Sequence, residues 1–224
     1  MKKLVPSIFT SFNLLCGFFA ILSDDIRIGS IFILCSLFFD AFDGLVARML
    51  NVSSEIGKEL DSLSDLVSFG VAPAYLYILI SPFDNMWKYV PASIFVVAAA
   101  VRLAKFNLLP ASKYFKGMPT PTAAFFLVGV LLAIYYGDNF IYDLSKDPAF
   151  YAMTPIILSG LMNSNMNMFS LKSVNSGMLI DKLFPALSFL CFLILLFTNP
   201  ELALPVSTMF YLTLSLVHNV MTRK

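Results

Sequence analysis

The stretch from Asp40 to Asp65 reads DAFDGLVARMLNVSSEIGKELDSLSD and places four carboxylates where two strongly apolar segments adjoin. Asp40 and Asp43 are three residues apart, and Asp61 and Asp65 are four residues apart. On helices, both spacings put the two carboxylates of a pair on one face, with Cβ atoms roughly 5–6 Å apart. Acidic residues at the edge of a membrane span are costly and indicate function. Two such pairs facing each other need positive charge, which one or two divalent cations with oxygen ligands supply most simply.

The rest of the chain has the composition of a membrane protein. Of its 224 residues, 58% are hydrophobic, 13% are charged, and 23 are phenylalanine. Soluble domains are typically about 45–50% apolar and about 25% charged. Most of this chain is therefore expected to lie in a lipid bilayer, and we expect no nucleic-acid partner. The three cysteines lie inside apolar runs, where they are expected to be small buried side chains without a metal or disulfide role.

Eight apolar segments have lengths near the roughly 20 residues that a membrane-spanning helix needs. They cover residues 5–22, 27–48, 57–81, 90–106, 120–136, 149–165, 182–198 and 201–220. We therefore predict an all-α integral membrane protein with about eight transmembrane helices. Ser53 is predicted to cap the N-terminus of the third helix. Only Asn199-Pro200-Glu201 separates the last two segments, so they are predicted to form a helical hairpin.

The basic residues predict how the chain is oriented in the membrane. If both termini are cytosolic, only Arg27, Lys88 and Lys146 of the 15 lysines and arginines fall in outer connections, and the other twelve fall inside. This split follows the positive-inside rule and favours an even number of spans. The acidic stretch then faces the cytosol from the cell membrane. We predict one membrane-embedded domain over 1–224, with a six-helix core at about 1–172 and a C-terminal hairpin at about 182–220.

Small residues and one arginine accompany the carboxylates. Gly44 and Ala47 follow on the first acidic helix, and Gly57 precedes Asp61 by one helical turn. Small residues let backbones approach closely or leave room for a flat ligand. Arg48, at the cytosolic end of its helix, is a natural partner for a phosphate. This combination suggests a metal-bound, phosphorylated, nucleotide-like substrate, since paired metals are a common device for phosphoryl displacement.

The whole pattern resembles the signature of a known family. Eight positions with fixed identity and spacing read DxxDGxxAR-x8-GxxxDxxxD between Asp40 and Asp65, as in the CDP-alcohol phosphotransferase family. Its members are integral membrane enzymes, often homodimeric, that transfer a phosphatidyl-type group from a CDP-linked donor to an alcohol and release CMP. The resemblance implies two Mg²⁺ or Mn²⁺ ions held by Asp40, Asp43, Asp61 and Asp65. It also implies that Gly44, Ala47 and Gly57 line the cytidine pocket, with Arg48 near the diphosphate, and that the protein is a homodimer.

The flanking sequence is similar to the phosphatidylserine synthase branch of that family. The similar stretches are DSLSDLVSFGVAPA at Asp61–Ala74, PSIFTSFNLLCG at Pro6–Gly17 with its Thr-x-x-Asn-x-x-x-Gly opening, RLAKFN at Arg102–Asn107 and GMPTP at Gly117–Pro121. This branch implies CDP-diacylglycerol, or an ether-lipid analogue, as donor and L-serine as acceptor. Ser7 and the stretch Asn163–Lys172 depart from the branch, and the same chemistry with another acceptor, such as glycerol 3-phosphate, is the alternative.

A small zwitterionic acceptor needs a cation for its carboxylate. Arg102 lies deep in an apolar run, and Lys116 precedes a Gly-Met-Pro turn, so both are candidates to bind serine or a lipid phosphate. Asn107 and Asn13 are candidate hydrogen-bond donors in the same cavity. The alternative explanations are membrane orientation for the cations and helix packing for the asparagines.

The reaction also needs a base, because the pKa of a serine hydroxyl is far above neutral. We predict Asp65 as this general base and as a metal ligand, with Asp61 as a second catalytic carboxylate. A non-enzymatic alternative is a cation transporter that uses the same carboxylates within the membrane. That alternative requires a polar path along other spans, and the segments 120–136 and 182–198 carry almost no polar residues.

Overall fold

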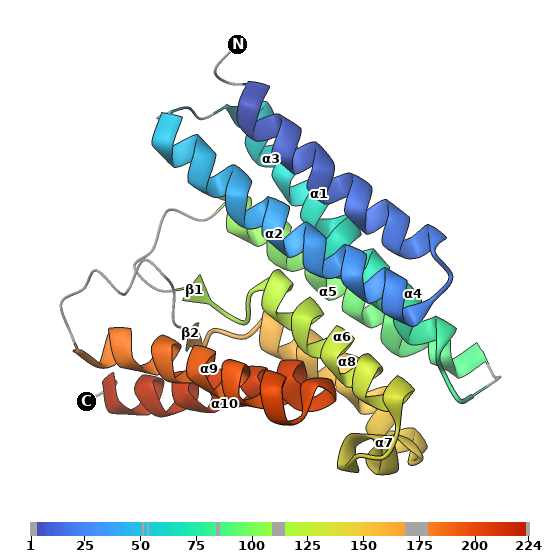
Figure 1. Cartoon of the computed structure of the whole chain (residues 1–224). Coiled ribbons are helices and arrows are strands. Elements are labelled where there is room, and N and C mark those ends of the chain that lie inside the picture. The colour runs from blue at the N-terminus through green and yellow to red at the C-terminus, as the bar shows by residue number, and fades with distance from the viewer. Residues whose placement is uncertain are drawn as a thin grey trace. The chain divides into compact units, whose positions relative to one another are not determined.

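The computed structural model describes residues 4–50, 52, 54–83, 86–108, 115–168 and 179–222. The chain divides into two compact units, Met1–Leu109 and Pro110–Lys224 (Figure 1). Almost every described residue outside the short connections is helical, which confirms the predicted helical class. Each of the eight predicted segments corresponds to a helix, with ends that differ by a few residues.

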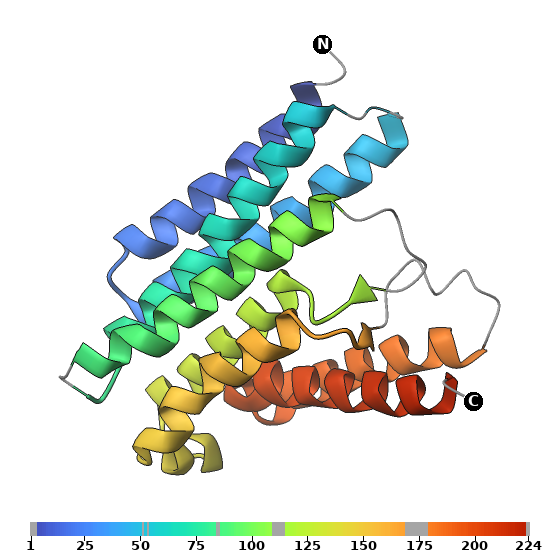
Figure 2. The same ribbon diagram turned by 180° about the vertical axis from the view of Figure 1, so that it is seen from behind.

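The first unit is a group of long helices packed side by side (Figures 1 and 2). Helix α1 packs along α2 and also contacts α3 and the π-helical segment η1, while α5 packs against η1 and α4. The elements are α1 (Leu4–Leu22), α2 (Ile26–Leu50), α3 (Glu55–Asp65), η1 (Leu66–Val71), α4 (Ala72–Leu79), the 3₁₀ turn η2 (Met86–Lys88) and α5 (Tyr89–Leu108).

The segments α3, η1 and α4 together form one continuous helical stretch, Glu55–Leu79. Its middle widens into a π-helical turn directly after Asp65, where the Ala72 N–H donates to the Val67 carbonyl. Pro73 has no N–H to donate and follows this turn at once. Short π-helical segments are rare and often occur at functional sites, and the apolar pattern of the sequence does not predict this one.

The start of α3 differs in detail from the sequence prediction. Ser54 is the N-cap, and its hydroxyl oxygen accepts a hydrogen bond of 3.0 Å from the Gly57 N–H. Ser53, the predicted cap, lies outside the described residues, and the prediction is wrong because its neighbour Ser54 fills this role. The extended backbone of Ser54 (φ −142°, ψ 144°) turns its side chain back over the first helical turn.

Helices also dominate the second unit. Helix α6 packs against α10, and the predicted hairpin of α9 and α10 is confirmed, with only Asn199 between the two helices. A two-residue antiparallel pairing of β1 with β2 was not predicted from the sequence. The elements are β1 (Phe115–Lys116), α6 (Thr120–Tyr136), α7 (Phe140–Ser145), α8 (Pro148–Met162), β2 (Asn167–Met168), α9 (Leu179–Thr198) and α10 (Pro200–Thr222).

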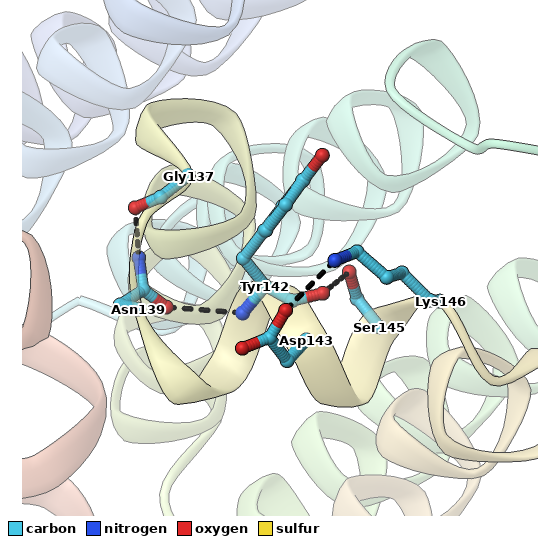
Figure 3. Close-up of polar contacts among 6 residues, drawn as sticks. All are labelled: Gly137, Asn139, Tyr142, Asp143, Ser145 and Lys146. Atoms are coloured by element: carbon cyan, nitrogen blue, oxygen red, sulfur yellow. Dashed lines mark hydrogen bonds and ion pairs between the residues drawn. The ribbon is translucent and has the colours of Figure 1, made fainter.

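The connection after α6 contains the short helix α7, which the sequence also did not predict (Figure 3). Gly137 turns the chain with a positive φ of 69°, a conformation that glycine adopts without strain. Asn139 then donates to the Gly137 carbonyl at 2.7 Å and accepts from the Tyr142 N–H at 3.0 Å, which caps α7. Asp143 and Lys146 form an exposed ion pair of 2.7 Å along this helix. Local side-chain capping therefore stabilises this connection.

The described helices indicate a multi-pass membrane protein. Four of them are long and apolar enough to cross a membrane: Ile26–Leu50, Glu55–Leu79, Met86–Leu108 and Pro200–Val217. Shorter apolar helices cover Pro6–Leu22, Thr120–Tyr136, Pro148–Met162 and Ala186–Thr198. Many large apolar side chains on these helices are exposed, which is the arrangement that lipid contact requires. Examples are Phe12, Phe18, Phe38, Phe189 and Phe197.

Candidate active site

Three of the four aspartates meet between α2 and α3. Asp40, Asp61 and Asp65 each offer a carboxylate oxygen, and these three oxygens lie within 4.8 Å of one another. Asp65 is buried, while the other two are half-buried. Oxygen Oδ1 of Asp61 is buried and has no hydrogen-bond partner among the described residues. Three oxygens at this separation, one of them without a hydrogen bond, fit the oxygen ligands that Mg²⁺ or Mn²⁺ prefers.

The fourth aspartate, Asp43, is held separately. It is buried on α2, and its Oδ2 accepts a hydrogen bond of 2.8 Å from the Thr10 hydroxyl of α1. A hydrogen bond to a charged acceptor is stronger than one between neutral groups. Asp43 is therefore oriented from α1, and the group of three mutually close carboxylates does not include it.

A cavity of about 240 Å³ opens beside these carboxylates, between α1, α2 and the start of α3. Asp61 belongs to both the acidic group and the cavity wall, so the two features form one site. The cavity lining consists of Pro6, Ser7, Thr10, Asp43, Gly44, Ala47, Val52, Ser54, Gly57, Lys58 and Asp61. This volume is slightly below the roughly 300–1,000 Å³ of cavities that hold a whole small ligand, which suits one part of a larger ligand.

The small residues of the signature shape this cavity. Gly44, Ala47 and Gly57 all line it. A Cβ atom added to Gly44 would have only a guanidinium nitrogen of Arg48 within 4 Å, at 4.0 Å. A Cβ atom added to Gly57 would lie 2.8 Å from the Ser54 hydroxyl oxygen. Gly44 therefore leaves space for a ligand. Gly57 lines the same cavity and, because it has no side chain, also leaves space for the Ser54 hydroxyl that caps α3.

The sequence prediction did not include several residues of the cavity wall. Thr10 belongs to the Thr-x-x-Asn opening, and this motif was the available signal for it. Lys58 follows Gly57 directly, and its ammonium donates to the Asn107 carbonyl of α5 at 2.8 Å. Ser7, noted only as a departure from relatives, also lines the cavity. Their contribution depends on how α1 and α5 pack against α3, so the local pattern does not reveal it.

Two other predicted residues, Asn13 and Arg102, lie near Asp65. Asn13 is fully buried on α1, and its amide nitrogen donates to Asp65 Oδ1 at 3.1 Å. Arg102 is buried on α5 and interacts electrostatically with Asp65. Neither is among the described residues that line the cavity. The structure thus places an amide and a guanidinium close to the predicted base.

The remaining predicted residues occupy different positions. Arg48 is exposed, and its Nε donates to the Gly44 carbonyl at 2.8 Å, which keeps the guanidinium near the cavity. Asn107 is half-buried, and its amide donates to the Ser62 hydroxyl at 2.9 Å, which links α5 to α3. Lys116 is exposed on β1 in the second unit.

The chain is also similar in sequence to known proteins. A family model described as CDP-alcohol phosphatidyltransferase matches residues 3–163. The chain is similar to the CDP-diacylglycerol–serine O-phosphatidyltransferases of Saccharomyces cerevisiae (40% identity over 140 residues, 57% of this chain and 50% of the relative) and Methanocaldococcus jannaschii (44% over 120 residues, 54% and 56%). It is also similar to the protein of that name from Helicobacter pylori strain 26695 (34% over 223 residues, 96% and 90%). The matches thus span about half the length of the first two relatives and nine-tenths of the third.

Proposed function

Because the chain belongs to the CDP-alcohol phosphatidyltransferase family, we propose that it transfers a phosphatidyl group from CDP-diacylglycerol to the hydroxyl of L-serine and releases CMP. An ether-lipid analogue is the other possible donor. The three relatives described above are all named for the serine reaction. The observation that carries the proposal is the group of three carboxylates within 4.8 Å beside a cavity lined by small residues.

We propose that the site takes two Mg²⁺ or Mn²⁺ ions. Asp40, Asp61 and Asp65 would hold metal, and Asp43 would complete the set from the cavity wall. The buried Asp61 oxygen, without a hydrogen bond in the described part of the chain, supports this assignment. A bound divalent metal would neutralise phosphate charge and stabilise the leaving oxygen.

The residues of the cavity would bind the nucleotide part of the donor. Gly44, Ala47 and Gly57 leave room for the cytidine, and Arg48 at the cavity edge would contact the diphosphate through its planar guanidinium. Lys58 adds a second positive charge to the cavity wall. The acyl or ether chains of the donor would extend into the bilayer.

In the chemical step, the serine hydroxyl attacks the phosphorus that carries the lipid. A new oxygen–phosphorus bond forms while the bond from that phosphorus to CMP breaks, and CMP leaves with the electron pair. Asp65 would accept the hydroxyl proton as the attack proceeds. Arg102, which interacts with Asp65, is the proposed contact for the serine carboxylate. Asn107 and Lys116 are further proposed contacts to the acceptor or a lipid phosphate.

The orientation and assembly are proposals as well. We propose eight spans with both termini in the cytosol, an active site that faces the cytosol from the cell membrane, and a homodimer. The core at about 1–172 and the hairpin at about 182–220 would form one functional domain. The twelve-to-three distribution of basic residues supports the orientation.

An acceptor competition tests the proposed function. The purified protein is given CDP-diacylglycerol and Mn²⁺ together with serine, glycerol 3-phosphate, inositol phosphate or choline in parallel reactions. We expect CMP release and lipid product with serine. A lipid product formed only with another alcohol would contradict the serine assignment but keep the reaction class. An absence of CMP release with every acceptor would contradict both.

A further inference from the structure

Helix α1 contacts the aspartate-bearing helices α2 and α3, and then η1, at three positions about one helical turn apart. Thr10 donates to Asp43 on α2, and Asn13 donates to Asp65 on α3. One turn further on, Gly17 packs so closely against η1 that a Cβ would collide with Ser68. These three residues are the fixed positions of the Thr-x-x-Asn-x-x-x-Gly opening, so the motif consists of the α1 residues that contact α2, α3 and η1.

Asn13, the middle residue of this motif, is fixed from two sides. The main-chain carbonyl of Asn13 accepts hydrogen bonds from the Ser36 hydroxyl of α2 at 3.1 Å and the Ser68 hydroxyl of η1 at 2.9 Å. Its side chain is 0% exposed. The Asn13 amide therefore reaches Asp65 from a backbone whose position both neighbouring elements determine.

We infer that Asn13 is a positioning residue that holds one oxygen of Asp65 and thereby directs the other carboxylate oxygen toward the reacting hydroxyl. This inference rests on the proposed function, which makes Asp65 the base. A carboxylate without such a restraint rotates about its terminal torsion, because that torsion has broad minima. Small errors in the placement of a reacting group are costly, since a displacement of about 1 Å can lower the rate about 10²-fold.

The alternative is that Asn13 only holds helices together. Its Oδ1 atom argues against this alternative, because it is buried and has no hydrogen-bond partner in the described part of the chain. An unsatisfied buried polar atom destabilises a fold, and an apolar residue of similar shape would avoid that penalty. The amide is better explained by the hydrogen bond that its nitrogen gives to Asp65.

Because Asn13 lies outside the described cavity lining, its expected effect on the kinetics differs from that of a residue that touches the donor. Thr10 lines the cavity, whereas Asn13 is not among its described lining residues. A change at Asn13 should therefore lower kcat and leave KM for the CDP-linked donor nearly unchanged. A residue that touches the donor in its ground state would raise KM instead.

The test measures CMP release by Asn13→Ala in detergent micelles with CDP-diacylglycerol, serine and Mn²⁺. We expect kcat to fall about 10²-fold and both KM values to stay within about threefold. Ser36→Ala is the matched control, because it removes a buried hydroxyl from the same helix contact but leaves in place both the Asn13 amide and the Ser68 hydrogen bond that holds the Asn13 carbonyl. Its kcat should stay within about threefold of the unmodified protein.

A second variant, together with melting temperatures, distinguishes loss of the amide from loss of folding. Asn13→Thr has nearly the volume of asparagine, and its hydroxyl is expected to bond to its own helix, so it should lose kcat as the alanine variant does. The inference is overturned if both Asn13 variants keep kcat within about threefold, if only KM changes, or if Ser36→Ala loses as much kcat as Asn13→Ala. A loss of kcat in both Asn13 variants, each of which still unfolds cooperatively above the assay temperature, supports it.

A stability measurement distinguishes failure of this inference from failure of the proposed function. Melting temperatures of Asn13→Ala, Asp65→Asn and the double variant form a cycle that needs no activity. We expect the two changes to be non-additive by about 2 °C or more. Additive changes would refute the Asn13–Asp65 contact whatever the enzyme does. If the two changes are non-additive but the unmodified protein releases no CMP, the proposed function is refuted and the Asn13–Asp65 contact is not.

Discussion

Gly44→Ala should make the protein more stable and less active. Alanine is favoured over glycine inside a helix by about 0.5–1 kcal/mol, and nothing in the described structure obstructs the new methyl group. Its nearest neighbour would be a guanidinium nitrogen of Arg48 at 4.0 Å. For a chain of this size, this gain corresponds to a rise in melting temperature of about 1–4 °C.

The loss of activity follows from the cavity. Gly44 lines the space of about 240 Å³ that would receive the nucleotide, so the added methyl group takes part of that space. Extra carbon in a filled site typically costs about 1–3 kcal/mol, which corresponds to roughly a 5- to 150-fold rise in KM for CDP-diacylglycerol. Melting curves and CMP-release kinetics on the same preparation measure both effects.

Gly160→Ala is the matched control for this prediction. Gly160 is an exposed glycine inside α8, and a Cβ there has nothing within 4 Å. Alanine should raise the melting temperature there by a similar amount and leave KM unchanged. A Gly44→Ala protein with the KM of the unmodified enzyme would refute the assignment of this cavity to the donor. A lower melting temperature would refute the argument from open space.

Three further changes test other parts of the site. Asp61→Asn should abolish CMP release while the melting temperature is maintained or rises, because the change removes a metal ligand but no hydrogen bond from the buried Oδ1 atom; normal activity would contradict the metal site. Thr10→Val removes the hydrogen bond to Asp43 and should lower kcat/KM by about 10- to 150-fold, the effect of about 1.5–3 kcal/mol for a charged hydrogen bond. Thr10→Ser, which keeps the hydroxyl, should retain most activity, and equal losses in both variants would exclude the hydrogen bond as the cause. Gly17→Ala should lower the melting temperature by several degrees, because its Cβ would lie 2.7 Å from the Ser68 Cα atom and overpacking costs about 1–3 kcal/mol; an unchanged melting temperature would show that α1 and η1 can separate.

Hydrophobicity alone predicted the eight apolar helical stretches, because a helix that contacts lipid must be apolar along most of its length and must satisfy its own backbone hydrogen bonds. The shorter elements were not predictable in this way. Helix α7 depends on side-chain capping by Asn139, and β1–β2 depends on pairing between segments far apart in the chain. The π-helical turn after Asp65 lies within a uniformly apolar run, so hydrophobicity does not distinguish it from the α-helix around it.

The sequence by itself determined the reaction class of the family, the membrane character and the four aspartates, since these depend on residue identity and local spacing. Tertiary structure alone decided how those aspartates are arranged. Asp40, Asp61 and Asp65 meet because α1 packs against both α2 and α3, while Asp43 is held separately by Thr10. The contact of Asn13 with Asp65 joins residues 52 positions apart. Spacing along one helix fixes which side chains share a face, but only the packing of α1 against both acidic helices determines which oxygens of Asp43 and Asp65 accept its hydrogen bonds.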